Sequence, residues 1–387
     1  MKGYAHIKQE AFPVHTLKRV DRPTTMIMDE KVERTDEREQ GFNRAGRGDF
    51  GKHVQEQRLR FVRKQPLSGA LLQMELILKN VVDGVAASTK APMTDDPQFL
   101  SRHIKETAYF LRADMVGICE LPSYAVYTHS GGDPRNPDDE GKPVNLNHKY
   151  AVSILIDQGW RTSRASTGHD WISNSMSFMG YSTSGFISCI LADYIRRLGY
   201  PARAHHALNY QVVVPPILLL SGLGEMCRIG DIVLNPFLGS RFKAAVVTTD
   251  LPLVPDKPID FGLQDFCSKC NKCARECPGN ALSEGEKIIF NGYERWPTDV
   301  AKCTAMRVGN MKGSGCGTCI KVCPWNKPYT PLHRAVGWTM RHSSLARRFA
   351  VWGDDILGYG KPRPEEKWWL DLESVEEVMQ VAGSKKP

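Results

Sequence analysis

Long apolar runs are missing from this sequence of 387 residues. The longest, residues 212–220, contains Pro215 and Pro216 and is nine residues long, whereas a membrane-spanning helix needs about 20 apolar residues. Residues 1–30 hold no apolar core of the kind found in secretory signal peptides. We therefore expect a cytoplasmic chain with no transmembrane segment and no leader peptide, and a trimmed exported form is the alternative.

Clustered positive charge is missing as well. The formal net charge is +8, but the 51 Lys and Arg residues are spread along the chain instead of being gathered in one stretch. Charge spread in this way suits an acidic partner protein or cofactor phosphates, and we expect no nucleic-acid partner. The length allows two or three domains with a large buried core.

Cysteine, in contrast, is abundant and concentrated. Eight of the 11 cysteines form two runs that each end in Cys-Pro, namely Cys267, Cys270, Cys273 and Cys277, and then Cys303, Cys316, Cys319 and Cys323. Bacterial ferredoxins bind each 4Fe-4S cluster through three cysteines of one run and the Cys-Pro cysteine of the other. The spacing therefore assigns Cys267, Cys270, Cys273 and Cys323 to one cluster, and Cys303, Cys316, Cys319 and Cys277 to a second.

The second run departs from the simple ferredoxin pattern. Cys303 stands 13 residues before Cys316, with Gly313 and Gly315 between them, and we expect this loop to close around the cluster. Structural zinc is the alternative for Cys-x-x-Cys pairs, but it does not explain a triple repeat that ends in Cys-Pro twice. Thiolate ligands also suit a reducing compartment. The remaining cysteines, Cys119, Cys189 and Cys227, are expected to be ordinary buried thiols.

Hydrophobic periodicity predicts an α+β fold. Helices are expected from residue 68, over residues 96–112, and from an N-cap at Ser182 or Thr183 up to Gly199. Short strands are expected at residues 115–120, 150–158, 202–214 and 244–249, and residues 131–147 are predicted to be a loop.

Four segments follow one another along the chain. Residues 1–65 are polar and are expected to form an extended N-terminal arm, and residues 66–258 form the main domain. Residues 259–330 are the ferredoxin-like two-cluster module, and residues 331–387 form an aromatic-rich C-terminal segment that packs on the core. Because such a module only moves electrons, the chemistry must lie elsewhere in the chain or in a partner.

Several motifs accompany the cysteine runs. They are Leu-Gly-Glu-Met-Cys-Arg-Ile-Gly at 223–230, Pro-Phe-Leu-Gly-Ser-Arg at 236–241, Thr-Asp-Leu-Pro-Leu at 249–253 and Gly-Cys-Gly-Thr-Cys-Ile-Lys-Val-Cys-Pro-Trp-Asn-Lys-Pro at 315–328. In this order the chain resembles the corrinoid-dependent reductive dehalogenases, from about Lys149 to Pro328 and more weakly beyond both ends.

This resemblance implies that residues 66–258 form a nitroreductase-like core that holds cobalamin with its lower base detached. It also implies that an aromatic or alkenyl organohalide exchanges its carbon-halogen bond for a carbon-hydrogen bond, with two electrons and one proton. Some members carry a fused flavin reductase, whereas this chain ends soon after the cluster module. A separate ferredoxin or flavin reductase is therefore the expected electron donor.

By the same resemblance, Tyr181 is the expected proton donor. It precedes the expected helix start, where oriented N–H groups would favour a phenolate. The family places an Arg or Lys beside this tyrosine, and Arg241 matches that motif position better than Lys243, which would share its side of a strand. A fixed cation of this kind would stabilise the phenolate. A buried hydrogen-bonded tyrosine and a surface salt bridge are the structural alternatives.

Further candidates for cofactor contacts are His205, His206, Asn209, Gly222, Gly224 and Trp325. The glycines would let backbone amides approach the nucleotide tail of the cofactor, although their spacing matches no dinucleotide fingerprint. The resemblance implies that no histidine ligates cobalt. Two other functions stay open, namely epoxyqueuosine reductase, which also joins cobalamin to two clusters, and a ferredoxin-type electron-transfer subunit without catalysis of its own.

Overall fold

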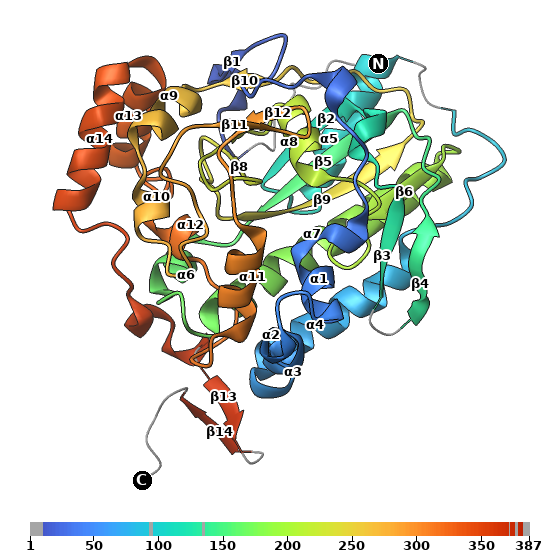
Figure 1. Ribbon diagram of the computed structural model, residues 1–387. Helices are drawn as coiled ribbons and strands as arrows, with labels where there is room; N and C mark the ends of the chain where they lie inside the picture. Colours follow the sequence, from blue (N-terminus) through green and yellow to red (C-terminus); the bar gives the residue numbers. More distant parts are fainter. Residues whose placement is uncertain (1–10, 93–95, 134–135, 371, 376–377, 382–387) are drawn as a thin grey trace.

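The computed structural model describes residues 11–92, 96–133, 136–370, 372–375 and 378–381. At its centre lies a four-stranded antiparallel sheet in the order β2-β5-β9-β6 (Figure 1). Its strands are β2 (Met115–Glu120), β5 (Tyr150–Asp157), β9 (Phe242–Thr249) and β6 (Ala202–His205). Because side chains alternate along a strand, Val152 and Ile154 enter the core on one face of the sheet, whereas Ala151 enters the core on the other.

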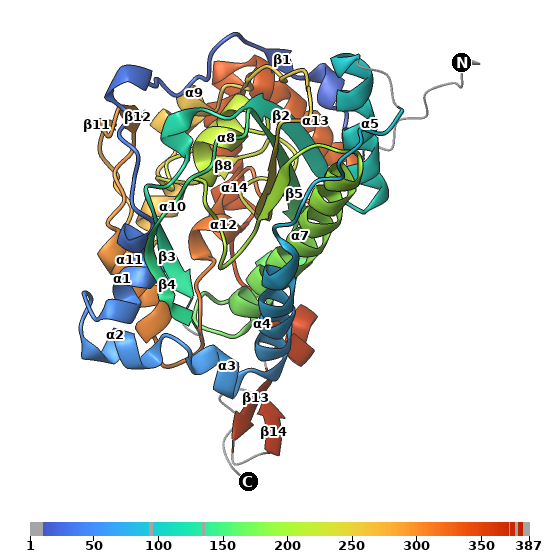
Figure 2. The ribbon, with the colours of Figure 1, turned by 90° about the vertical axis from the view of Figure 1, so that its right-hand side faces the viewer.

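Helices cover both faces of this sheet. Helices α5 (Pro97–Phe110) and α7 (Ile172–Arg197) lie on one side with α4 (Pro66–Leu78) packed on α7, and α8 (Val214–Leu220) lies on the other side (Figure 2). Asp96 accepts a hydrogen bond of 2.9 Å from the backbone N–H of Gln98, so α5 has the acidic cap and first-turn proline that its sequence predicts. The predicted α+β fold class is confirmed.

Helix α7 begins at Ile172 and not at the expected cap near Ser182. Asp170 Oδ1 accepts a hydrogen bond of 2.9 Å from the backbone N–H of Ile172 and thereby starts the helix. The Ser182 hydroxyl instead donates to the carbonyl of Phe178, four residues back, as a serine inside a helix does. Tyr181 therefore lies within α7, and the expectation that a helix N-terminus tunes it was wrong.

Two other expectations need correction. Strand β6 ends at His205, and residues 214–220 form α8 because prolines are tolerated in the first turn of a helix. The predicted loop over residues 131–147 contains the hairpin of β3 (His129–Asp133) and β4 (Asn136–Pro143). Smaller elements between the sheet strands are α6 (Trp160–Ala165), β7 (Glu225–Met226) and β8 (Val233–Leu234).

The cysteine-bearing segment is built from short elements. They are β10 (Ile259–Asp260), α9 (Leu263–Lys269), α10 (Lys272–Arg275), β11 (Ile288–Phe290), β12 (Tyr293–Arg295), α11 (Val300–Gly309) and α12 (Thr318–Val322). The N-terminal segment wraps around them, since β1 (Lys18–Arg19) pairs with β10 and helices α1 (Gly41–Arg47) and α2 (Lys52–Gln57) contact α11. Helix α3 (Arg60–Lys64) leads from there into α4.

The C-terminal segment forms a helical hairpin at the outer edge of the molecule (Figure 1). Helices α13 (Pro331–His342) and α14 (Ser344–Ile356) pack together, and α14 contacts α9. Strands β13 (Leu372–Val375) and β14 (Val378–Val381) form a separate hairpin. No helix in the described ranges has the length and apolarity needed to cross a bilayer. The domain boundaries at residues 65, 258 and 330 stay predictions.

Candidate active site and cluster sites

The eight cysteines of the two runs lie close to one another in the fold. We name Cys267, Cys270, Cys273 and Cys323 the first cysteine group. All four side chains are buried in the same hydrophobic core. Burial raises the pKa of the Cys273 thiol, and Cys323, Cys267 and Cys270 raise it further because they lie within electrostatic reach. Such thiols need iron to become thiolates, since deprotonation in an apolar site is otherwise unfavourable.

The other four cysteines, Cys277, Cys303, Cys316 and Cys319, form the second cysteine group. Burial raises the pKa of Cys319 well above its ordinary value, and the contributing neighbours are Cys316, Cys273, Cys303 and Cys277. Because Cys273 belongs to the first group, the two groups lie within electrostatic reach of each other. The assignment of each cysteine to a cluster stays a prediction.

The glycines between Cys303 and Cys316 let this loop approach helix α7. A Cβ on Gly313 would lie 2.4 Å from the backbone of Asp170, and one on Gly315 would lie 3.4 Å from the backbone nitrogen of Asn174. The second cysteine group thus packs against the first turn of α7. This contact explains why the long spacing in the second run is rich in glycine.

Sequence reasoning treated Cys227 as an ordinary buried thiol, but it lies beside the first cysteine group. Burial raises its pKa well above the ordinary value, and Cys267, Cys273 and Cys323 contribute. Its neighbour Arg228 donates from Nε to the Cys267 carbonyl at 2.9 Å. The Cys-Arg pair within the Leu-Gly-Glu-Met-Cys-Arg motif at 223–228 is the sequence signal that could have indicated that Cys227 lies near the cluster cysteines.

Tyr181 and Lys243 form the central pair of the candidate active site. The Lys243 ammonium lies 4.7 Å from the centre of the Tyr181 ring. Lys243 lies on β9. Because side chains alternate between the two faces of a strand, Lys243 shares the face of Val247, which is directed toward α7. Tyr181 is partly exposed. The contact is a cation–π interaction, in which the ammonium lies over the face of the aromatic ring.

Tyr210 lies near this pair. Its hydroxyl donates to the carbonyl of Ala244 at 2.6 Å. Burial raises the pKa of Tyr210 well above its ordinary value, and Tyr181 adds to the rise. Tyr210 is therefore held in its neutral, hydrogen-bonded form. Tyr181, in contrast, has the Lys243 ammonium beside its ring.

Arg241 does not hold the position beside Tyr181 that the sequence predicted. Strand β9 begins only at Phe242, and the Arg241 guanidinium turns to Asp157, with Nε 2.9 Å from Oδ1. It also donates to Asn326 Oδ1 and to the Lys327 carbonyl, both at 3.0 Å. Arg241 thus connects the end of β5 to the segment after Cys323. The cation that contacts the Tyr181 ring is Lys243.

Gly180 lets α7 approach the sheet closely enough to bring this pair together. A Cβ at this position would lie 2.9 Å from Lys243 Cγ and 3.3 Å from Gln158 Cγ. Neither neighbour is the free end of a side chain, so a larger residue would have to displace the helix or the strand.

We expect the substitution Gly180→Ala to lower turnover by about 10-fold, because a displacement near 1 Å at a reacting group can cost that much or more. Alanine favours a helix by about 1 kcal/mol over glycine, so the loss of stability should be small. Turnover and melting temperature are the measurements. Gly337→Ala in α13, where nothing lies within 4 Å of the added Cβ, is the matched control and should keep full turnover with a small chemical reductant.

The candidate histidines belong to a buried network instead of facing a cavity. His206 Nδ1 lies 2.8 Å from Glu75 Oε2, and Asn209 Nδ2 lies 3.1 Å from His206 Nε2. His205 lies 2.9 Å from both Arg203 and Thr248, and burial lowers its pKa well below the ordinary value. Both ring nitrogens of each histidine are engaged in hydrogen bonds within the protein. We do not retain His205, His206 or Asn209 as cofactor contacts.

Gly222 and Gly224 pack against the chain's own backbone. A Cβ on Gly222 would lie 2.3 Å from the Lys257 carbonyl oxygen, and one on Gly224 would lie 2.4 Å from that of Leu234. The expectation of a loop that faces a phosphate is corrected, because these contacts account for both glycines. Trp325 is buried in the same hydrophobic core as the first cysteine group. Its ring meets the ring of Phe261 edge-on, with ring centres 5.1 Å apart.

Several buried polar groups around this site have no hydrogen-bond partner among the described residues. They are both amide atoms of Gln158, Asn174 Oδ1 and Ser240 Oγ. Buried polar atoms nearly always have partners, so these groups fit a polar cofactor with its own donors and acceptors. Gln158 is a neighbour of Gly180, and its backbone N–H donates to the Arg241 carbonyl at 2.9 Å. Gln158 therefore lies beside the Tyr181–Lys243 pair.

Known proteins share this arrangement. Residues 266–326 match a family model described as a 4Fe-4S double cluster binding domain. The tetrachloroethene reductive dehalogenase of Sulfurospirillum multivorans is 28% identical over 317 residues, which cover 74% of this chain and 62% of that protein. The solved structure of the catabolic reductive dehalogenase NpRdhA, in complex with 3-bromo-4-hydroxybenzoic acid, matches with a TM-score of 0.90 and 41% identity. The chain is homologous to the reductive dehalogenases.

The reductive dehalogenase match confirms the predicted pairing of a nitroreductase-like core with a ferredoxin-like domain. It covers 96% of this chain and 53% of NpRdhA, so this chain spans about half the length of that dehalogenase. The epoxyqueuosine reductase of Cyclobacterium marinum is 30% identical over only 121 residues, or 28% of this chain. Similarity to reductive dehalogenases therefore extends over far more of the sequence than similarity to epoxyqueuosine reductase.

Proposed function

We propose that this chain catalyses reductive dehalogenation, in which an organohalide takes up two electrons and one proton and releases halide. The observation that carries the proposal is the Lys243 ammonium 4.7 Å from the Tyr181 ring, in a fold that matches a catabolic reductive dehalogenase with a TM-score of 0.90.

The two cysteine groups supply the electron path. Each 4Fe-4S cluster carries one electron at a time, so two transfers are needed for each halide released. Cys273 and Cys319 lie within electrostatic reach of each other and belong to different groups, which favours transfer from one cluster to the other. The second cysteine group packs on the first turn of α7, the helix that carries Tyr181.

Cobalamin is the cofactor that we propose for this site, and when bound it supplies the strong reductant that breaks the carbon-halogen bond. Gln158, Asn174 and Ser240 would hold its amide-bearing periphery, because their buried polar atoms have no partner within the described residues. A second reductive dehalogenase structure, which matches with a TM-score of 0.90 and 41% identity, suggests a mechanism for B12-dependent dehalogenation.

Tyr181 is the proposed proton donor to the substrate carbon. Donating the proton leaves a phenolate, which the neighbouring Lys243 ammonium stabilises. Tyr210 keeps its proton because burial raises its pKa. Arg241, bound to Asp157 and Asn326, positions the loop after Cys323 and has no proposed contact with the substrate.

We expect Lys243→Gln to reduce kcat by about 10²-fold with little change in melting temperature, because one fixed charge near the transition state is removed. Arg241→Gln should instead lower stability by about 3 kcal/mol, since it leaves Asp157 without its buried partner. The measurements are steady-state kinetics and thermal unfolding of the holoenzyme. The assignment fails if Arg241→Gln is the variant that loses kcat without a loss of stability.

The test of the function itself is halide release from a panel of halogenated phenols, benzoates and alkenes, with reduced methyl viologen as the electron source. Holoenzyme that contains cobalt and iron should release halide from at least one class of substrate. If iron-loaded protein binds no cobalamin, the chain is an electron carrier and the proposal is wrong.

A further inference from the structure

The helical hairpin of α13 and α14 exposes a stripe of large apolar side chains. Leu345, Phe349, Trp352 and Ile356 are spaced by four, three and four residues, so they share one face of α14. That face points outward, since Phe349 is 61% exposed and Trp352 is 65% exposed. An amphipathic helix normally buries this stripe, and exposed apolar patches of this kind mark interaction sites.

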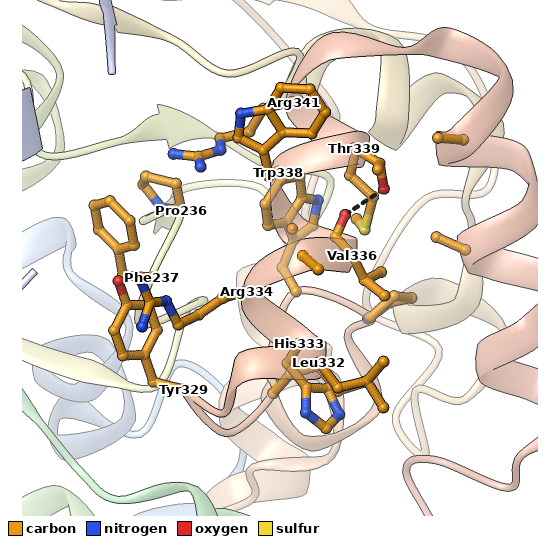
Figure 3. A pocket seen from close by; sticks show the side chains of 18 of the residues that line it. Pro236, Phe237, Tyr329, Leu332, His333, Arg334, Val336, Trp338, Thr339 and Arg341 are labelled. Carbon is orange, nitrogen blue, oxygen red and sulfur yellow. Dashed lines mark hydrogen bonds between the residues drawn. The ribbon is translucent and has the colours of Figure 1, made fainter. Parts of the chain in front are cut away.

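A pocket of about 1110 Å³ lies at the base of this hairpin. Figure 3 shows Trp338 and Arg341 of α13 together with Phe237 and Tyr329 around it. The pocket also reaches Pro324 and Trp325, which directly follow Cys323 of the first cysteine group. The exposed face and the first cluster site are therefore neighbours.

Arginines without acidic partners accompany the apolar stripe. Within the described residues, Arg334, Arg341 and Arg348 form no salt bridge, whereas Arg347 is bound to Asp265 at 2.7 Å. Arg341 lies over the Phe237 ring at 5.8 Å, and its buried Nη1 has no hydrogen-bond partner. The exposed Arg334 and Arg348 thus present positive charge that no acidic residue in the described part of the chain pairs with in a salt bridge.

The hairpin is held rigidly to the first cysteine group. Lys272, between Cys270 and Cys273, is bound to Asp354 of α14 at 2.6 Å, and both side chains are almost fully buried. Lys327 also binds Asp354 from the segment after Cys323. A buried pair of this kind is costly to break, so a partner on α14 would be held in a fixed position relative to this cluster.

We infer that the exposed face of α13 and α14 is the docking surface for an acidic electron-transfer protein that reduces the cluster of the first cysteine group. The inference rests on the proposed function and names the point at which its electrons enter. A one-electron donor docks, passes its electron to the cluster and leaves oxidised, so two donors are consumed for each halide released.

An acidic protein fits this surface better than the other possible occupants. A second copy of the chain would bring the unpaired arginines of both copies together, which is repulsive. A flat bilayer would not fill the pocket between Phe237 and Trp338, whereas a protruding side chain of a protein would. Electrostatic attraction between the arginines and acidic residues would also speed the encounter.

The experiment compares two reductants for the same holoenzyme. Trp352→Ser and Arg348→Glu alter exposed residues of α14, and Phe290→Ser alters a 55% exposed phenylalanine of β11 as the matched control. With a reduced acidic 2Fe-2S ferredoxin as donor, both α14 variants should raise the donor KM by about 10-fold, and the wild-type KM should rise with salt. With reduced methyl viologen, all three variants should match the wild type.

An unchanged ferredoxin KM in both α14 variants overturns the inference. It is also overturned if Trp352→Ser abolishes binding to phosphatidylglycerol vesicles, or dissociates a dimer in sedimentation analysis, while the ferredoxin KM stays as in the wild type. Failure of the wild type to release halide with methyl viologen is a different result, because it contradicts the proposed function and not the docking surface.

Discussion

Tyr181→Phe is expected to lower dehalogenation by about 10³-fold, with iron and cobalt contents equal to those of the wild type. Phenylalanine keeps the ring that packs against Phe178, with ring centres 6.4 Å apart, and removes only the hydroxyl group. General acids contribute about 10²-fold to 10⁴-fold to rate, so this loss is the mark of a proton donor. The measurement is single-turnover halide release at saturating reductant.

Tyr210→Phe is the matched control for this substitution. Tyr210 is a second tyrosine at the same site, but its hydroxyl is bound to the Ala244 carbonyl at 2.6 Å. Its loss should cost about 1 kcal/mol of stability, since a hydrogen bond contributes roughly that amount, and turnover should stay within about 10-fold of the wild type. If Tyr181→Phe and Tyr210→Phe exchange these outcomes, Tyr210 is the donor.

Cys270→Ser is expected to remove about half of the iron and to abolish turnover with every reductant. Each 4Fe-4S cluster needs four cysteine ligands, and Cys270 belongs to the first cysteine group. Iron analysis and the visible absorbance of the clusters are the measurements. A variant that keeps all its iron would show that another thiol replaces Cys270 or that the grouping is wrong.

Cys227→Ala distinguishes these two explanations. Cys227 is buried beside Cys267, Cys273 and Cys323, but it stands outside the Cys-x-x-Cys-x-x-Cys run. We expect this variant to keep both clusters and most of its turnover. If it loses iron as Cys270→Ser does, Cys227 is a ligand and the ferredoxin pattern does not describe the first cysteine group.

Local sequence signals were sufficient for several elements. The strand over residues 115–120 and the Asp96 cap of α5 were predicted correctly, because both depend on neighbours in the chain. The start of α7 was missed, since the serines around Gly180 looked like a helix cap. The Asp170 carboxylate, which starts the helix, stands ten positions before Gly180, too far for a local cap pattern around Gly180 to indicate it.

The choice between Arg241 and Lys243 shows the limit of a pattern. The two residues are two positions apart, so alternation places both on one side of a strand. Only the point at which β9 begins separates them, and it is set by pairing of Phe242 with Asp157 of β5. Arg241, just outside the strand, turns to the Asp157 carboxylate.

The eight cysteines illustrate the opposite case, because their spacing alone predicts a two-cluster module, and residues 266–326 match a 4Fe-4S double cluster binding domain. A cubane needs ligands of one type at short, repeated intervals, and such intervals are visible in the sequence. The Tyr181–Lys243 pair, the polar atoms of Gln158 and the outward stripe of α14 arise from contacts between residues far apart in the chain. The spacing of residues along the chain does not indicate those contacts, because they form only when the helices pack on the sheet.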